Sequence, residues 1–233
     1  MAEGKITVVH NGVDLERFSA VYTGRPLVGL DKIKKGLGFR NKGNANRRIK
    51  IGVIGRLEPQ KGHKYFLEAI RLMRDKSDKA EFCIAGEGSL RKELENLCQS
   101  YGISHQVKFL GFRPDIKDIM GSLDILVLPS LFEGLPLVAL EASAMGKAVI
   151  VTNVDGSPEV VIHNETGLVV PAEDSKALKE AMEKLIIDDH LRQQFGEQAR
   201  KRVENYFDLK KQVKETEVIY KKVLERMAPC PGF

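Results

Sequence analysis

The 233-residue sequence contains no tryptophan, and aromatic residues make up only 6% of it. Proteins that stack nucleic-acid bases rely on aromatic side chains, so composition gives no support for a nucleic-acid partner. No uninterrupted apolar stretch reaches the roughly 18 residues that indicate a membrane-spanning helix. The N-terminus also lacks a signal-peptide pattern, so the predicted location is the cytoplasm.

Cysteine is scarce, with residues only at positions 83, 98 and 230. An odd number at wide spacing predicts neither a disulfide framework nor a zinc site. Cys83 falls in a predicted strand and Cys98 on the apolar face of a predicted helix. We therefore expect both as core thiols of a protein from a reducing compartment.

Metal-binding patterns are missing as well. No Asp-x-Asp pair is present to hold a metal–diphosphate complex, and the histidines show no ligand spacing. We therefore predict no metal and no cofactor. Each histidine is expected at the surface or in a loop: His10, His63, His105, His163 and His190.

Two common phosphate-binding sequence motifs, the P-loop and the dinucleotide fingerprint, are not present in this sequence. No segment matches the P-loop pattern. Residues 86–91 (GEGSLR) begin like the dinucleotide fingerprint, but Arg91 stands in the place of its third glycine. The segment also follows the second predicted strand of its unit rather than the first, which disfavours an oxidoreductase.

The net charge of +5 is unevenly distributed, because nine Lys or Arg residues between positions 25 and 50 face a single acid, Asp31. A solvated connection is the common explanation of such a stretch. The alternative is peripheral contact with anionic lipid head groups at the inner face of the cell membrane.

Short apolar strands alternate with amphipathic helices along most of the chain. This alternation predicts an α/β fold with a Rossmann-like, doubly wound parallel sheet and helices on both faces. Strands are predicted at 49–54, 81–85, 106–110, 124–128, 148–152 and 167–170. Helices are predicted at 62–76, 89–101, 114–120, from Pro136 onward, and at 158–162, 175–187 (capped by Asp174), 189–205 and 208–227.

The most informative motif is FEGLPLVALE at residues 132–141, which places Glu133 and Glu141 eight positions apart across a strand-to-helix turn. Pro136 suits the first turn of the following helix. Open α/β sheets bind ligands at the carboxyl ends of their strands, and a helix N-terminus there favours anions. Carboxylates accept hydrogen bonds, so both acids are expected to bind hydroxyl groups on either side of a phosphate.

A second strand-to-helix turn carries cations. Residues 55–62 (GRLEPQKG) follow the predicted strand 49–54 and contain Arg56 and Lys61. A guanidinium can hold phosphate oxygens in a bidentate fork, and an ammonium adds a point charge. The two turns together predict a ligand with a sugar, a phosphate and a ribose.

Five segments in one order carry a family resemblance: 55–62 (GRLEPQKG), 84–88 (IAGEG), 109–112 (FLGF), 132–141 (FEGLPLVALE) and 155–161 (DGSPEVV). Together they resemble the C-terminal, donor-binding domain of GT-B retaining glycosyltransferases of family 4, also known as glycosyl transferases group 1. The resemblance runs from about residue 8 to residue 220.

The resemblance implies a role for each site residue. Glu133 would hold donor-sugar hydroxyls, Arg56 and Lys61 the diphosphate, and Glu141 the ribose. Gly134 and Leu135 would offer backbone N–H groups, and the base would lie near Phe112 and Arg113. The remaining positions of the donor site would be Gly55, Gly86, Gly88 and Pro136. Purely structural roles remain possible for four residues in these segments. Gly86 and Gly88 would equally well allow a tight turn, and Glu87 and Glu159 would suit the first turns of helices.

The implied reaction transfers a hexosyl group from a UDP-, GDP- or ADP-sugar to a glycan or lipid-linked acceptor, with retention and without a metal. Arg56, Lys61 and the helix N-terminus near Gly134 would stabilise the departing diphosphate. The alternatives are a sugar-nucleotide epimerase or phosphorylase of the same architecture, or a non-enzymatic nucleotide-binding or membrane-docking module.

The resemblance also predicts the domain organisation. Residues 1–20 would form an interdomain junction, 21–204 the nucleotide-sugar-binding domain, 205–228 a helix that packs on an N-terminal domain absent from this chain, and 229–233 a tail. The isolated chain is then expected to be inactive. Pairing with a separately encoded N-terminal subunit is the alternative.

Overall fold

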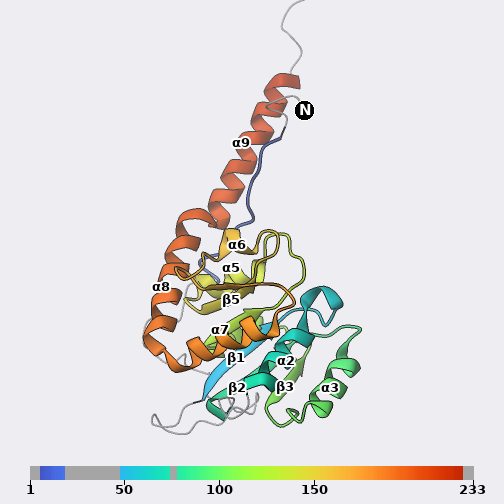
Figure 1. Cartoon of the computed structure of the whole chain (residues 1–233). Coiled ribbons are helices and arrows are strands. Elements are labelled where there is room, and N and C mark those ends of the chain that lie inside the picture. The colour runs from blue at the N-terminus through green and yellow to red at the C-terminus, as the bar shows by residue number, and fades with distance from the viewer. Residues whose placement is uncertain (1–5, 19–47, 74–77, 228–233) are drawn as a thin grey trace, which may run out of the picture.

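Figure 1 shows the computed structural model, which describes residues 6–18, 48–73 and 78–227. Its centre is a six-stranded sheet in the order β3-β2-β1-β4-β5-β6, and every neighbouring pair is parallel. The strands are β1 (Ile49–Ile54), β2 (Ala80–Ala85), β3 (Val107–Gly111), β4 (Ile125–Leu128), β5 (Ala148–Thr152) and β6 (Leu168–Val170). The predicted doubly wound, Rossmann-like sheet is confirmed.

The central strands are short runs of branched aliphatic residues. β4 (ILVL) and β5 (AVIVT) are buried at every position, as expected for parallel strands covered on both faces. The strand order reverses between β1 and β4, which are neighbours in the sheet but not in the sequence. In open α/β sheets the loops beside such a reversal form the ligand crevice.

Helices cover both faces of the sheet, as predicted (Figure 1). One core cluster joins the sheet to α2 (His63–Met73), α3 (Arg91–Ser100) and α7 (Ser175–Ile187). The other joins it to α4 (Ile116–Ser122), α5 (Leu137–Ala144) and the short α6 (Ser157–Val160). The helix α8 (Asp189–Tyr206) belongs to both, because Phe195 lies in the first cluster and Val203 in the second.

Several predicted boundaries move by one or two residues. The helix predicted from residue 89 begins at Arg91, so Glu87 is not a first-turn acid; it accepts a hydrogen bond from Arg91 Nη1 at 3.1 Å. The predicted cap of α7 is confirmed, since the Asp174 carboxylate accepts from the amides of Lys176 and Ala177. The end of the helix predicted to residue 76 lies outside the described residues.

Both predicted core thiols are buried, and burial raises the pKa of Cys83 to about 12 and that of Cys98 to about 11. Cys230 and most of the basic stretch lie outside the described residues.

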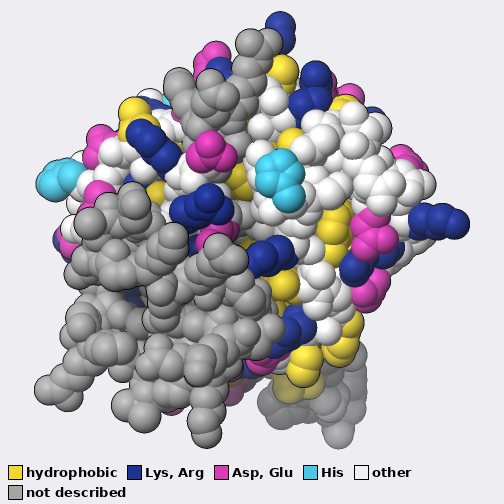
Figure 2. Space-filling model, turned by 90° about the horizontal axis from the view of Figure 1, so that it is seen from below, with side chains coloured by type: hydrophobic (Ala, Val, Ile, Leu, Met, Phe, Trp, Pro, Cys, Tyr) yellow, Lys and Arg dark blue, Asp and Glu magenta, His cyan; other side chains and the backbone are white. Residues whose placement is uncertain are grey.

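Figure 2 shows one face of the molecule, where basic and acidic side chains alternate among small apolar areas on the part that is described. Within that same part no helix is both long and apolar enough to cross a bilayer.

The last helix, α9 (Leu209–Met227), projects from the body, with the N-terminal segment running beside it (Figure 1). The two are tied at the base, where Val13 N donates to Phe207 O at 2.8 Å and Leu209 N donates to Val13 O at 3.1 Å. Apolar side chains stay exposed along α9, among them Val213 at 49% and Tyr220 at 66%. Their packing on another domain stays a prediction.

Candidate functional site

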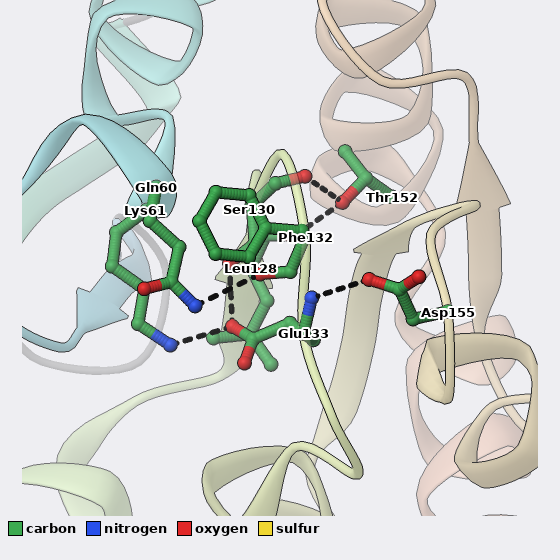
Figure 3. A network of polar contacts seen from close by, with 8 residues as sticks. All are labelled: Gln60, Lys61, Leu128, Ser130, Phe132, Glu133, Thr152 and Asp155. Carbon is green, nitrogen blue, oxygen red and sulfur yellow. Dashed lines mark hydrogen bonds and ion pairs between the residues drawn. The ribbon is translucent and has the colours of Figure 1, made fainter.

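The candidate site lies at the carboxyl ends of β1, β4 and β5. Because these strands are neighbours in the sheet, the loops that follow them lie side by side. The loop after β1 contacts the loop after β4 through Gln60: its carbonyl accepts from Leu131 N at 2.8 Å, and its side-chain amide donates to Phe132 O at 3.1 Å. Figure 3 shows this contact from close by.

Lys61 and Glu133 meet between these loops (Figure 3). Lys61 Nζ lies 2.6 Å from Glu133 Oε1, and Ser130 Oγ donates to the same oxygen at 2.7 Å. The Glu133 side chain is 8% exposed and that of Lys61 21% exposed. The structure thus brings the acid of one turn and a cation of the other into direct contact. The sequence analysis expected both residues at one site, but it did not predict that they would contact each other.

Close backbone approach accounts for two of the predicted site glycines. A Cβ at Gly86, where φ is +145°, would lie 1.9 Å from Gly55 O, and one at Gly88 would lie 2.5 Å from Leu57 O. These contacts join the loops after β1 and β2, so the structural alternative is sufficient for both positions. Gly134 differs, since a Cβ there would meet nothing within 4 Å. The residue is exposed, and space is open on the side where a side chain would stand.

The helix α5 begins one residue after Pro136, which occupies the N-cap position with φ −72°. Glu141 follows in its second turn and is half-buried. Burial raises the pKa of Glu141, and the positive charge of Arg17 opposes that shift. The second acid of the motif is therefore a partly desolvated carboxylate on the same helix whose N-terminus carries the open loop.

Arg56 is exposed on the loop after β1. The same loop carries Glu58, which the sequence did not single out. Glu58 accepts hydrogen bonds from Ser89 N at 3.0 Å and Ser89 Oγ at 2.8 Å, and these bonds lower the pKa of Glu58. Glu58 therefore fixes the Arg56 loop to the loop after β2.

The predicted base-binding residues lie after β3. Phe112 is 77% exposed, as a stacking residue would be. Arg113 is engaged with Asp115 through two hydrogen bonds, of which the one from Nε to Oδ1 is 2.8 Å long. This pairing raises the pKa of Arg113 and lowers that of Asp115. The contact of Phe112 and Arg113 with a base stays a prediction.

One histidine corrects the sequence analysis. His63 was expected at the surface, but it is 1% exposed, and neither ring nitrogen has a hydrogen-bond partner. Burial, and secondarily the charge of Lys61, lowers the pKa of His63 to about 4. The signal was present in the sequence, because His63 shares the spacing of the buried face of α2 with Phe66, Leu67 and Ile70.

Two further polar residues were missed or undervalued. Asp155 accepts a hydrogen bond from Glu133 N at 2.8 Å (Figure 3). Glu159 lies in the first turn of α6, as its structural role predicted. Its Oε2 also lies 2.9 Å from His10 Nε2. Both belong to the segment DGSPEVV, so the motif was recognised while these contacts were not, because they form between elements distant in sequence.

Comparison with known proteins agrees with this geometry. The sequence profile described as glycosyl transferases group 1 matches residues 38–202. The UDP-Gal:alpha-D-GlcNAc-diphosphoundecaprenol alpha-1,3-galactosyltransferase of Escherichia coli is 31% identical over 220 residues, which cover 93% of this chain and 54% of that protein.

Solved structures give the same result for the fold. The Anabaena protein HepE, crystallised with UDP, superposes with a TM-score of 0.81 at 23% identity, covering 93% of this chain and 57% of that one. The C-terminal domain of the glycosyl transferase group 1 family protein LpcC from Francisella tularensis has a TM-score of 0.72 at 28% identity. It is covered completely, by 85% of this chain.

The profile match extends over more than half of the chain, from β1 through most of α8. The chain spans about half the length of the curated relatives it matches. Its parallel sheet, its acid-bearing turn after β4 and its cation-bearing turn after β1 agree with that match. The chain therefore belongs to the glycosyl transferases group 1 family.

Proposed function

We propose that this chain is the donor-binding part of a retaining, metal-independent glycosyltransferase of family 4 that transfers a hexosyl group to a glycan or lipid-linked acceptor. The observation that carries the proposal is the joint position of Lys61 and Glu133, 2.6 Å apart next to the exposed Gly134. A cation, a hydroxyl-binding acid and unshielded amides at one sheet edge suit a sugar joined to a diphosphate.

Each group has a distinct task in this proposal. Arg56 and Lys61 neutralise the diphosphate, whose negative charge grows as it leaves the sugar. Preplaced donors lower that barrier because they need little reorganisation. Glu133 orients the sugar through its hydroxyls, and Glu141 accepts hydrogen bonds from the ribose.

Two kinds of support guide the choice of ligand. The E. coli relative is named for UDP-Gal and for a diphosphoundecaprenol acceptor. The Anabaena protein was crystallised with UDP and with UDP-glucose. Since this chain spans about half of its relatives, the acceptor site belongs in our proposal to an additional domain, and the chain alone binds donor without transferring sugar.

Isothermal titration of the chain with UDP, GDP and ADP, and with their glucose conjugates, tests the proposal. We expect one base to be preferred, and we expect Arg56→Ala or Glu141→Gln to weaken binding by about tenfold to a hundredfold, the equivalent of one charge-assisted hydrogen bond. Lys176→Ala is the matched control, because Lys176 is an exposed cation on α7 and is not part of the loops that carry the site. Absence of binding throughout, or an equal loss in the control, would refute the proposal.

A further inference from the structure

The loops after β4 and β5 stay in contact beyond the ends of their strands. Thr152 Oγ1 donates to Ser130 O at 2.5 Å, and Asp155 Oδ2 accepts from Glu133 N at 2.8 Å. Gly156 N then donates to Gly134 O at 3.0 Å. Each contact joins residues 22 positions apart, so the loop that carries Glu133 is attached to its neighbour at three successive levels.

Gly156 allows the two loops to approach this closely. A Cβ at this position would lie 2.2 Å from Gly134 O, closer than any side chain permits. The approach places the carboxylate of Asp155 directly against the backbone of the acid-bearing turn. Figure 3 shows Asp155 reaching the Glu133 amide on the side opposite Lys61.

Asp155 holds this position at a conformational cost. Its φ of +41° lies in the left-handed region, which residues with a Cβ rarely occupy. Glycine would adopt this backbone without strain, yet it would leave the Glu133 amide without its acceptor. Strained backbone of this kind clusters at functional sites, where the placement of a group is maintained at a cost in local stability. Asp155 fits that description, because its carboxylate accepts from the amide of a candidate site residue.

The hydrogen bond from Glu133 N to Asp155 Oδ2, called here the clamp, distinguishes the Glu133 amide from the two amides that follow it on the same turn. The Glu133 N–H is engaged by Asp155. Among the hydrogen bonds of the described residues, none has the amide of Gly134 or Leu135 as its donor. In the described part of the chain these two amides near the N-terminus of α5 therefore keep their hydrogens for another acceptor, while the Glu133 amide is engaged and its side chain contacts Lys61.

We propose that Asp155 is a positioning residue of the donor site, which fixes the Glu133 amide so that the Glu133 carboxylate meets the donor sugar and the next two amides face the ligand. This inference rests on the proposed function. Because Arg56 and Lys61 hold the diphosphate in that proposal, loss of the clamp acts mainly on the sugar end of the ligand.

Two substitutions separate the carboxylate from the backbone strain. Asp155→Gly removes the acceptor and relieves the positive φ, so the chain stays folded. Asp155→Asn keeps an oxygen acceptor on a residue that tolerates the left-handed region. The matched control is Asn164→Gly, which relieves a positive φ of 61° at an exposed position between α6 and β6.

Binding of UDP and UDP-glucose to these variants gives the decisive ratio. We expect Asp155→Gly to weaken UDP-glucose binding by about tenfold and UDP binding by less than about threefold, because the Glu133 carboxylate is then no longer held where it would accept hydrogen bonds from the sugar hydroxyls. Asp155→Asn and Asn164→Gly should stay within about threefold of the unmodified chain for both ligands. A residue that only maintained the fold would weaken both ligands equally.

Amide hydrogen exchange measured by NMR provides a second readout without ligand. The Glu133 amide should exchange faster in Asp155→Gly and remain protected in Asp155→Asn. Unchanged protection, or equal losses for UDP and UDP-glucose, would overturn the positioning role alone. A chain that binds neither the UDP pair nor any other nucleotide of the panel would overturn the proposed function, and this inference would fall with it.

Discussion

Among individual residues, His63 is unusual because it is a polar side chain enclosed without hydrogen bonds beside the candidate site. It is the first residue of α2 and follows Gly62, whose positive φ brings the chain against Pro129 O. Burial of an unpaired polar group costs about 1 to 3 kcal/mol. The neutral imidazole is tolerated there, but a charged one is not, as its lowered pKa indicates.

This residue makes the stability of the chain depend on pH. The pKa of His63 falls from 6.5 to about 4 on folding, so between these values the unfolded chain binds a proton that the folded chain does not. The contribution of neutral His63 to the free energy of unfolding is therefore fully present above pH 6.5. It is lost as the pH falls, by about 3 kcal/mol at pH 4. Urea unfolding followed by circular dichroism across this range measures the effect.

The variant His63→Leu should remove the loss of stability toward pH 4, while His190→Leu, at an exposed position on α8, should retain it. The raised pKa of Glu141 contributes a dependence of the opposite sign above pH 4.5, which both variants keep. The pKa values of Glu58 and Asp115 are lowered from ordinary values of 4.5 and 3.8, so these acids act mainly below this window. A slope that is the same in His63→Leu and in the unmodified chain would contradict the assignment.

At the scale of elements, the apolar periodicity was sufficient to predict each strand and the long helices. β1, β5 and α7 have the predicted bounds, because β1 is buried at all but its first position, β5 is buried throughout, and α7 is capped by Asp174. The start of α3 was not predictable from local pattern. Ser89 is held by Glu58, and Leu90 N donates to Leu57 O at 2.9 Å, so contacts from another loop delay the first helical turn to Arg91.

In the candidate site, too, some residues were predictable from local sequence and others were not. Glu133, Lys61 and Glu141 follow from strand-to-helix turns whose positions the sequence reveals. Asp155 could not be found in this way, because its contact with Glu133 depends on how two loops align after their strands end. Local patterns identify which turns carry chemistry, whereas the alignment of neighbouring turns requires the structure.

The close backbone contact between the loops after β1 and β2 can be tested by substitution of Gly86. The variant Gly86→Ala places a methyl group against Gly55 O and imposes a side chain at φ +145°, so we expect a loss of at least about 3 kcal/mol. Gly102→Ala is the matched control, since φ is +70° but nothing lies within 4 Å of the added Cβ. It should cost only about 1 to 2 kcal/mol. Thermal unfolding measures both, and similar losses would contradict the close approach.

At the scale of the whole molecule, the body and α9 differ in how their apolar side chains are used. α8 contributes Phe195 to one core cluster and Val203 to the other, so it holds both faces of the sheet together. α9 leaves Val213, Tyr220 and Val223 exposed. Packing of this face on an additional domain is part of the proposed function.

We expect Val223→Ser to change the free energy of unfolding of this chain by less than about 0.5 kcal/mol, because the side chain is 46% exposed. Phe195→Ala, at a position 1% exposed, should cost about 3 to 5 kcal/mol. Denaturant titration of both variants provides the comparison. A large loss in Val223→Ser would show that α9 already packs against the body of this chain.

The order of the strands has a consequence for synthesis. Ile51 of β1 pairs with Ile125 of β4, so on the ribosome the first strand must wait for its central neighbour until much of the nascent chain has emerged. The loop with Arg56 and Lys61 is made early, its counter-charge Glu133 appears later, and Asp155 later still. The candidate site is therefore completed late in translation, after β1 and β2 are already available to pair with each other.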